Sequence, residues 1–135
     1  MTAGSNADFR VVHLDNCVSV PAYEAELIFL RHGLGVGSFG MQVERLPAHY
    51  GAYAEHDEQD SGQEEIYTVL NGSARLLVSG EEHRLTPGVF ARVGPTVTRK
   101  IVTDEEPALL LCLGGVRGER YQPPSWTVPD QRRRS

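Results

Sequence analysis

The sequence His56–Gly72, HDEQDSGQEEIYTVLNG, places one histidine and several carboxylates just before a strand-like run that ends at Asn71-Gly72. Asn-Gly is the preferred centre of a two-residue type I′ hairpin turn. We therefore predict a hairpin at this point, continued by SARLLV at residues 73–78. A turn of this type fixes the register, so that Tyr67 faces Leu76 and Glu65 faces Val78.

The predicted register has a consequence for Glu65. Successive side chains of a strand point to opposite faces, so one face of this hairpin is apolar along most of its length. The residues on that face are Glu65, Tyr67, Val69, Ala74, Leu76 and Val78. A carboxylate at the end of an inward face is costly unless it is paired or bound to a cation. The sequence therefore predicts a partner for Glu65.

Short runs of alternating or continuous apolar residues recur along the whole chain, separated by Gly, Pro, Asn and acidic clusters. Such spacing without a sustained helical period favours an all-β sandwich or barrel with little helix. The predicted strands are Phe9–His13, Ala25–Arg31, Ser38–Arg45, Glu65–Leu70, Ala74–Ser79, Val89–Val93, Val97–Thr103 and Ala108–Leu113.

The length of 135 residues corresponds to one domain. We expect a single β-barrel domain over residues 9–128, a disordered N-terminus over residues 1–8 and a basic disordered tail over residues 129–135. Apart from the terminal Arg132–Arg134 the charge is strongly acidic, with 18 acidic against 13 basic residues in all, which argues against a nucleic-acid partner. No stretch approaches the length of a membrane span, and no apolar run marks a signal peptide at the N-terminus. Cys17 and Cys112 lie far apart in apolar runs, which indicates free thiols in the cytoplasm.

The spacing of the acidic stretch resembles the first motif of the cupins, which runs His-x-His, a spacer, Glu, six residues and Gly. His56-Asp57-Glu58, Glu65 and Gly72 follow that order. Pro87-Gly88 and the strand after it resemble the second motif, so that the resemblance covers roughly residues 38–113. It implies a cupin-like double-stranded β-helix (jelly-roll) barrel that binds a small organic molecule, and the habit of the family implies a homodimer.

The chain departs from the cupin pattern at two of the four expected metal ligands. Glu58 stands in place of the second histidine, and Arg99 falls where the histidine of the second motif is expected. A guanidinium stays protonated and has no lone pair to donate, so Arg99 cannot bind a metal. His56, Glu58 and Glu65, with Gln63 on the same strand face, remain as ligands for one divalent ion, which their chemistry allows to be Mn²⁺, Fe²⁺ or Zn²⁺.

Two hypotheses for the site therefore stay open. In the first, the metal ion acts on a small ligand in the barrel, with Tyr67 in the pocket, and the fold alone cannot say whether a reaction follows. In the second, the barrel is a metal-free, non-catalytic binding module in which Arg99 supplies the positive charge. Arg99 would then pair with the inward carboxylates or hold an anionic ligand.

Overall fold

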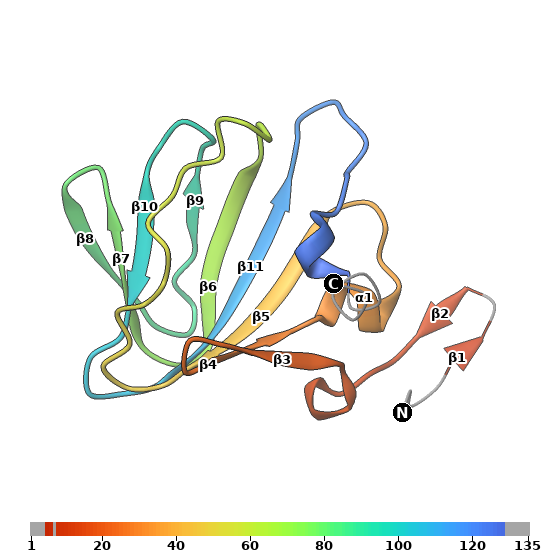
Figure 1. The fold of residues 1–135 in the computed structure, drawn as a ribbon, viewed down its shortest axis with the longest axis horizontal. Helices are drawn as coiled ribbons and strands as arrows, with labels where there is room; N and C mark the ends of the chain where they lie inside the picture. The colour runs from red at the N-terminus through yellow and green to blue at the C-terminus, as the bar shows by residue number, and fades with distance from the viewer. Residues whose placement is uncertain (1–4, 7, 129–135) are drawn as a thin grey trace.

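The computed structural model describes residues 5–6 and 8–128 of the chain, and these residues form two main β-sheets and a separate two-stranded sheet, with very little helix. This confirms the all-β prediction. Figure 1 shows the two sheets side by side, with the hairpin β1–β2 projecting from the barrel. The strands are β1 (Ser5–Asn6), β2 (Phe9–Arg10), β3 (Ser19–Ala22), β4 (Ala25–Ile28), β5 (Gly40–Leu46), β6 (Glu64–Gly72), β7 (Ala74–Val78), β8 (Glu81–Leu85), β9 (Ala91–Val93), β10 (Arg99–Val102) and β11 (Ala108–Gly115).

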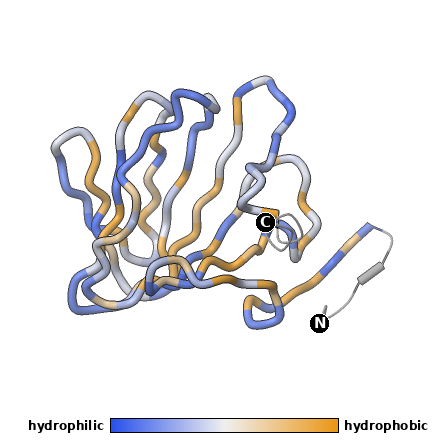
Figure 2. The backbone as a smooth tube through the Cα atoms, viewed as in Figure 1, coloured by the Kyte–Doolittle hydropathy of each residue, from blue (hydrophilic) through white to orange (hydrophobic). Residues whose placement is uncertain are grey.

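The larger sheet has six strands in the order β3-β4-β5-β11-β6-β9, and the smaller has three in the order β10-β7-β8. Their inner faces share one hydrophobic core. Tyr67, Val69 and Leu110 come from the larger sheet, and Leu76 and Ile101 come from the smaller one. Figure 2 shows the apolar residues along the strands and the hydrophilic ones mainly in the loops.

The predicted hairpin at Asn71-Gly72 is wrong. β6 pairs with β11 and β9, whereas β7 pairs with β10 and β8, so the chain passes from one sheet to the other at Ser73. Gly72 does have a positive φ of 79°, but Asn71 does not, so the turn is not of type I′. A Cβ at Gly72 would lie 1.9 Å from the carbonyl oxygen of Pro107, which shows that the close approach of a neighbouring strand requires the glycine.

The type I′ turn occurs one connection later, at Ser79-Gly80, where both residues have positive φ. It joins β7 to β8, and Val78 pairs with Glu81 instead of Glu65. The sequence did not predict β8, because the strand has the polar sequence EEHRL and lies exposed at the edge of its sheet. β3, another edge strand, was also missed.

A short helix, α1 (Leu30–Leu34), replaces the end of the predicted strand Ala25–Arg31. Gly35 ends it in the left-handed conformation, which satisfies the last carbonyl groups. Two 3-10 turns, Leu14–Asn16 and Ser125–Thr127, complete the helical elements of the described residues. No helix in this part of the chain is long and apolar enough to cross a membrane.

Ser5–Asn6 pair with Phe9–Arg10 in a short hairpin. The domain bounds and the disordered ends stay predictions. Residues 1–4 and 7, and the tail 129–135, lie outside the described residues. The two cysteines are free thiols, as predicted.

Candidate metal centre and cavity

The candidate metal ligands His56 and Glu58 lie in the long connection between β5 and β6, and this connection is fixed to the opposite sheet by backbone hydrogen bonds. His56 N donates to Arg99 O at 3.0 Å, and Arg99 N donates to His56 O at 2.8 Å. Glu58 N donates to Pro95 O at 2.8 Å. Glu65 belongs to β6 itself. A loop held by backbone hydrogen bonds and a strand therefore position the three side chains.

The three predicted ligands come together. One donor atom from each of His56, Glu58 and Glu65 lies within 4.8 Å of the others. His56 Nε2 is 3.2 Å from Glu58 Oε2 and 3.7 Å from Glu65 Oε1. Metal–ligand bonds of about 2.1 Å would place neighbouring ligand atoms roughly 3.0–3.4 Å apart for octahedral to tetrahedral angles. The donor set and its spacing fit one divalent ion.

The orientation of the His56 ring also fits metal binding. Its Nδ1 lies 3.0 Å from the carbonyl oxygen of Ala54, which accepts the Nδ1 proton. In the neutral ring this leaves the lone pair of Nε2 facing Glu58 and Glu65. Without a metal, the hydrogen bond to Glu65 raises the pKa of His56, although burial opposes it.

Glu65 faces inward, with a side chain only 14% exposed, and it has the partners that the sequence predicted. Tyr67 Oη donates to Glu65 Oε1 at 2.6 Å, and the Cys112 thiol donates to Oε2 at 3.6 Å. Burial alone would raise the pKa of Glu65, but hydrogen bonds from His56 and Tyr67 and the charge of Arg99 together lower it. The carboxylate is therefore held in its ionised form.

Arg99 is completely buried, and its Nε lies 3.9 Å from Glu65 Oε1. Nη2 donates to the carbonyl oxygens of Val93 and Gly94, whereas Nε and Nη1 have no hydrogen-bond partner. Tyr67 is also fully buried. Neither residue lines the cavity described below. Both lie behind Glu65, so the structure places the two predicted ligand-binding residues against a candidate metal ligand instead.

A cavity of about 400 Å³ opens beside the three candidate ligands. Its wall contains aromatic rings, carboxylates and small residues from the larger sheet, the β5–β6 connection and the C-terminal segment. The lining residues are Ala22, Tyr23, Gly40, Gln42, Glu44, Tyr50, Ala52, Tyr53, Ala54, His56, Glu58, Gln63, Glu65, Cys112, Gly114, Tyr121, Pro124, Trp126 and Thr127. Gln63, the fourth oxygen donor that the sequence suggested, is thus in the same cavity.

Glycines on two neighbouring strands form the floor next to Glu65. Gly114 of β11 pairs with Gly40 on one side and with Glu65 on the other. A Cβ at Gly40 would lie 2.8 Å from Tyr121 Oη, and one at Gly114 would lie 2.5 Å from Gln63 Oε1. Because Gly40 and Gly114 have no Cβ, Tyr121 and Gln63 can approach the sheet closely.

Glu44 is a cavity residue that the sequence analysis missed. It alternates with Gly40 and Gln42 on the inner face of β5, and its carboxylate has no ion pair or hydrogen bond among the described residues. Burial raises the pKa of Glu44 to about 7, although the charge of His56 acts in the opposite direction. The alternation of Met41, Gln42, Val43 and Glu44 carried the signal, but it suggests that the apolar residues face inward.

Comparison with solved structures supports the assignment of the fold. A cupin protein from Bacteroides fragilis superposes with a TM-score of 0.66 at 22% identity, covering 91% of this chain and 96% of that one. A sugar phosphate isomerase of the cupin superfamily from Silicibacter pomeroyi has the same TM-score at 21% identity over 83% and 76% of the two chains. For a polyketide cyclase from Streptomyces resistomycificus the TM-score is 0.64 at 19% identity, covering 82% and 80%. No family model and no curated protein matches the sequence. The chain is a small domain with the cupin β-barrel fold.

Proposed function

We propose that this domain binds one divalent metal ion through His56, Glu58 and Glu65 and takes a small organic molecule into the adjoining cavity. The observation that carries the proposal is the convergence of one imidazole nitrogen and two carboxylate oxygens at the cavity wall. Imidazole and carboxylate together suit Mn²⁺, Fe²⁺ or Zn²⁺. Gln63 is close enough in the fold to be considered as a further oxygen donor, since it lines the same cavity.

An ion held by three side chains supplies Lewis-acid polarisation at its open coordination positions. The protein's own residues would orient that ion. The Ala54 carbonyl oxygen fixes the His56 ring, and Tyr67 holds Glu65 by a hydrogen bond. Neighbours of the same fold are described as an isomerase, a cyclase and lyases, which act on small organic compounds. This supports the ligand class in general terms and assigns no reaction to this chain.

A metal-free binding module is the second candidate, and the position of Arg99 favours it. A buried guanidinium 3.9 Å from Glu65 partly neutralises that carboxylate, and a protonated His56 would neutralise it further. In this state the four side chains His56, Glu58, Glu65 and Arg99 carry no net charge. Arg99 is not among the residues that line the cavity, so its role in this candidate is to balance Glu65 and not to hold an anionic ligand.

Metal content distinguishes the two candidates. The protein is purified without an affinity tag and analysed for metals. It is then stripped with a chelator, the chelator is removed, and the melting temperature is measured with Mn²⁺, Fe²⁺ or Zn²⁺. We expect about one ion per chain and a rise in melting temperature, because a ligand that binds only the folded state stabilises it by about 2.7 kcal/mol at 100 times its Kd.

His56→Ala should abolish both the bound metal and the metal-dependent rise in melting temperature. The matched control is His83→Ala, which removes an exposed imidazole that is paired with Glu81 on the edge strand β8 and does not line the cavity. His83→Ala should retain the metal response. A wild-type protein without metal, with melting temperatures that no divalent ion changes, would establish the metal-free module instead.

A further inference from the structure

The charges in the cavity wall are mainly negative. Glu44, Glu58 and Glu65 supply carboxylates, and the only basic group among the described lining residues is His56. No lysine or arginine lines this part of the structure. A divalent ion at the three candidate ligands would offset the charges of Glu58 and Glu65, but not that of Glu44, which is ionised above about pH 7. An anionic ligand lying against Glu44 would therefore be repelled whether or not a metal is present.

Glu44 differs from the other two carboxylates because no hydrogen bond or ion pair holds it among the described residues, and only the more distant charge of His56 acts on it. Glu58 accepts a hydrogen bond from Ser61 at 2.7 Å, and Glu65 has Tyr67, His56 and Arg99 around it. Glu44 has no such partner among the described residues, yet it is held on a central part of β5 beside the cavity. Partly burying a carboxylate that has no hydrogen-bond partner costs stability, and a cationic group of a ligand would offset this cost. Burial raises the pKa of Glu44, and the charge of His56 only partly opposes this effect.

The mouth of the cavity is aromatic. Tyr23 and Trp126 line it while remaining 81% and 51% exposed, and Tyr50, Tyr53 and Tyr121 lie in its wall. Aromatic faces attract cations as well as apolar groups. Together with the acidic wall they form a surface suited to a positively charged ligand that has an apolar part.

The backbone conformation at Tyr23 also supports a ligand-binding role for the mouth of the cavity. The turn between β3 and β4 is Tyr23-Glu24, and both residues have positive φ, at 51° and 71°. Two-residue turns of this kind strongly prefer Asn and Gly, and a bulky residue there is strained. Strain of this kind collects at ligand-binding positions, where the side chain is needed for another purpose. Here the purpose would be to place an aromatic ring over the cavity.

We infer that the cavity binds an organic cation, with its positive charge beside Glu44 and its apolar part against Tyr23 and Trp126. The inference rests on the proposed function, because it concerns the ligand of the same cavity. It does not depend on the metal, because Glu44 is not one of the candidate metal ligands.

Three probes that share one ring test the ligand class: benzylamine as a cation, benzyl alcohol as a neutral compound and benzoate as an anion. Trp126 is the only tryptophan of the sequence and lines the mouth, so its fluorescence reports binding, with calorimetry as a second readout. The full chain is titrated at pH 8 with chelator present, which prevents benzoate from binding to a metal. We expect benzylamine to bind about tenfold or more tightly than benzyl alcohol, and benzoate to bind most weakly.

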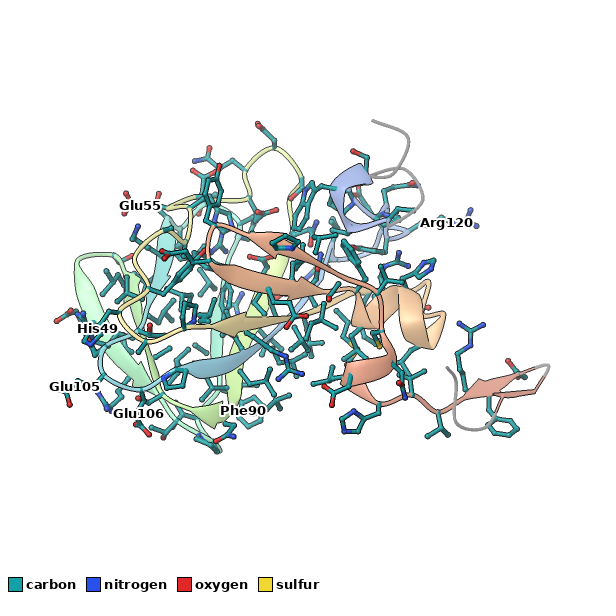
Figure 3. The ribbon with its side chains drawn as sticks, turned by 60° about the horizontal axis from the view of Figure 1, so that its bottom comes forward. His49, Glu55, Phe90, Glu105, Glu106 and Arg120 are labelled. Carbon is teal, nitrogen blue, oxygen red and sulfur yellow. The ribbon has the colours of Figure 1, made fainter. Side chains whose placement is uncertain are left out.

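Glu44→Gln should bring the Kd of benzylamine to within about threefold of that of benzyl alcohol, because the variant keeps the size of the side chain and removes its charge. The control is Glu105→Gln, which removes an exposed carboxylate distant from the C-terminal segment that lines the mouth (Figure 3). The control should keep the preference for benzylamine.

A preference for benzoate or benzyl alcohol, a benzylamine affinity that Glu44→Gln leaves unchanged, or failure of all three probes to bind would each overturn the inference. The proposed metal site is judged separately, by metal content and by the effect of His56→Ala on melting. A protein that binds no metal but prefers benzylamine would overturn only the metal proposal. A protein that binds metal but shows no preference for the cation would overturn only the inference about the ligand.

Discussion

His56 and Arg99 form an isolated antiparallel backbone pair, with two hydrogen bonds of 3.0 and 2.8 Å. Side chains of directly opposed residues in such a pair lie on the same side, with Cβ atoms about 5 Å apart. Arg99 stands where the resemblance to the cupins leads one to expect a fourth metal ligand, and it therefore projects into the same region as His56. Its charge is directed to Glu65 and its Nη2 to two backbone carbonyl groups.

Replacing Arg99 by alanine should lower the free energy of unfolding by about 3–5 kcal/mol, because it leaves Glu65 partly buried without its fixed counter-charge. Urea denaturation measures the change. Arg92→Ala is the control, since Arg92 is exposed and its nearest carboxylate, on Glu64, is 3.4 Å away. The control should change stability by less than about 0.5 kcal/mol. Equal effects of the two substitutions would contradict the structural role of Arg99.

Arg99→His should increase divalent-metal affinity, because it removes a positive charge from behind Glu65 and offers an imidazole beside His56. The expected result is a larger rise in melting temperature on addition of Zn²⁺ or Mn²⁺ than in the wild type. Arg99→Gln provides the comparison, since it removes the charge without adding a strong ligand. An equal response of the histidine and glutamine variants would show that the charge alone matters.

Gly72→Ala should lower the free energy of unfolding by more than about 2 kcal/mol, because the new Cβ would be 1.9 Å from the Pro107 carbonyl oxygen. Gly80→Ala separates this clash from backbone strain. Gly80 has a nearly identical φ of 75°, but nothing lies within 4 Å of its Cβ position. The control should cost only about 1 kcal/mol. Chemical denaturation of both variants gives the comparison. Similar losses of unfolding free energy would mean that the backbone at Pro107 moves aside at little cost.

The sequence predicted the class of the fold because strand length and alternation are local properties. The connection of strands into sheets is not local, and Gly72 illustrates this. Asn71-Gly72 correctly marked a sharp change of direction with a positive φ, but the same dipeptide serves a hairpin or a crossing between sheets. Only the position of Pro107, from a distant part of the chain, distinguishes the two.

The candidate ligands were predicted because their spacing followed a known motif, whereas Glu44 follows none. On β5 the usual alternation, with apolar side chains facing inward and polar ones outward, is inverted. Val43 is fully buried on the outer side, where α1 contacts β5, while Gln42 and Glu44 face a polar cavity. A pattern of apolar and polar residues shows which side chains share a face, but it does not show which face holds solvent or a ligand.

Glu44→Gln should stabilise the metal-free protein more at pH 8 than at pH 5. The folded state raises the pKa of Glu44 from the ordinary 4.5 to about 7, so it holds the proton more tightly than the unfolded chain does. The resulting stabilisation is complete below about pH 4.5 and is lost as the pH rises through 7. The difference in unfolding free energy between variant and wild type should grow by roughly 2 kcal/mol over this range.

Denaturation curves at several pH values, with chelator present, check this prediction. The other titratable groups that face the cavity, His56, Glu58, Glu65 and Cys112 among them, are present in both proteins and largely cancel in the difference. A difference that is independent of pH would show that Glu44 is ionised throughout the range.

The homodimer remains a prediction, and an exposed apolar area on the outer side of β6 suggests where to test it. Ile66 and Leu70 lie on that side, and Thr68 Oγ1 donates to Val89 O at 2.7 Å, which holds Val89 and Phe90 beside the strand. Phe90 is 70% exposed and lies at the surface (Figure 3). Large exposed apolar areas commonly mark protein interfaces.

Light scattering should therefore give twice the chain mass for the wild type and the single chain mass for Leu70→Ser/Phe90→Ser. Phe9→Ser is the control, because Phe9 is also exposed but lies on the projecting strand β2. The control should remain dimeric. A monomeric wild type at micromolar concentration would refute the prediction.

The place of β11 between β5 and β6 constrains how the chain acquires its fold during synthesis. β5 and β6 follow each other in sequence but do not pair, and each of them pairs with β11, which begins 36 residues after β6 ends. The larger sheet cannot close until residues 108–115 have left the ribosome. Until then β6 exposes an unpaired edge, which favours contact with other chains. Folding of this domain should therefore be dominated by contacts between distant parts of the sequence.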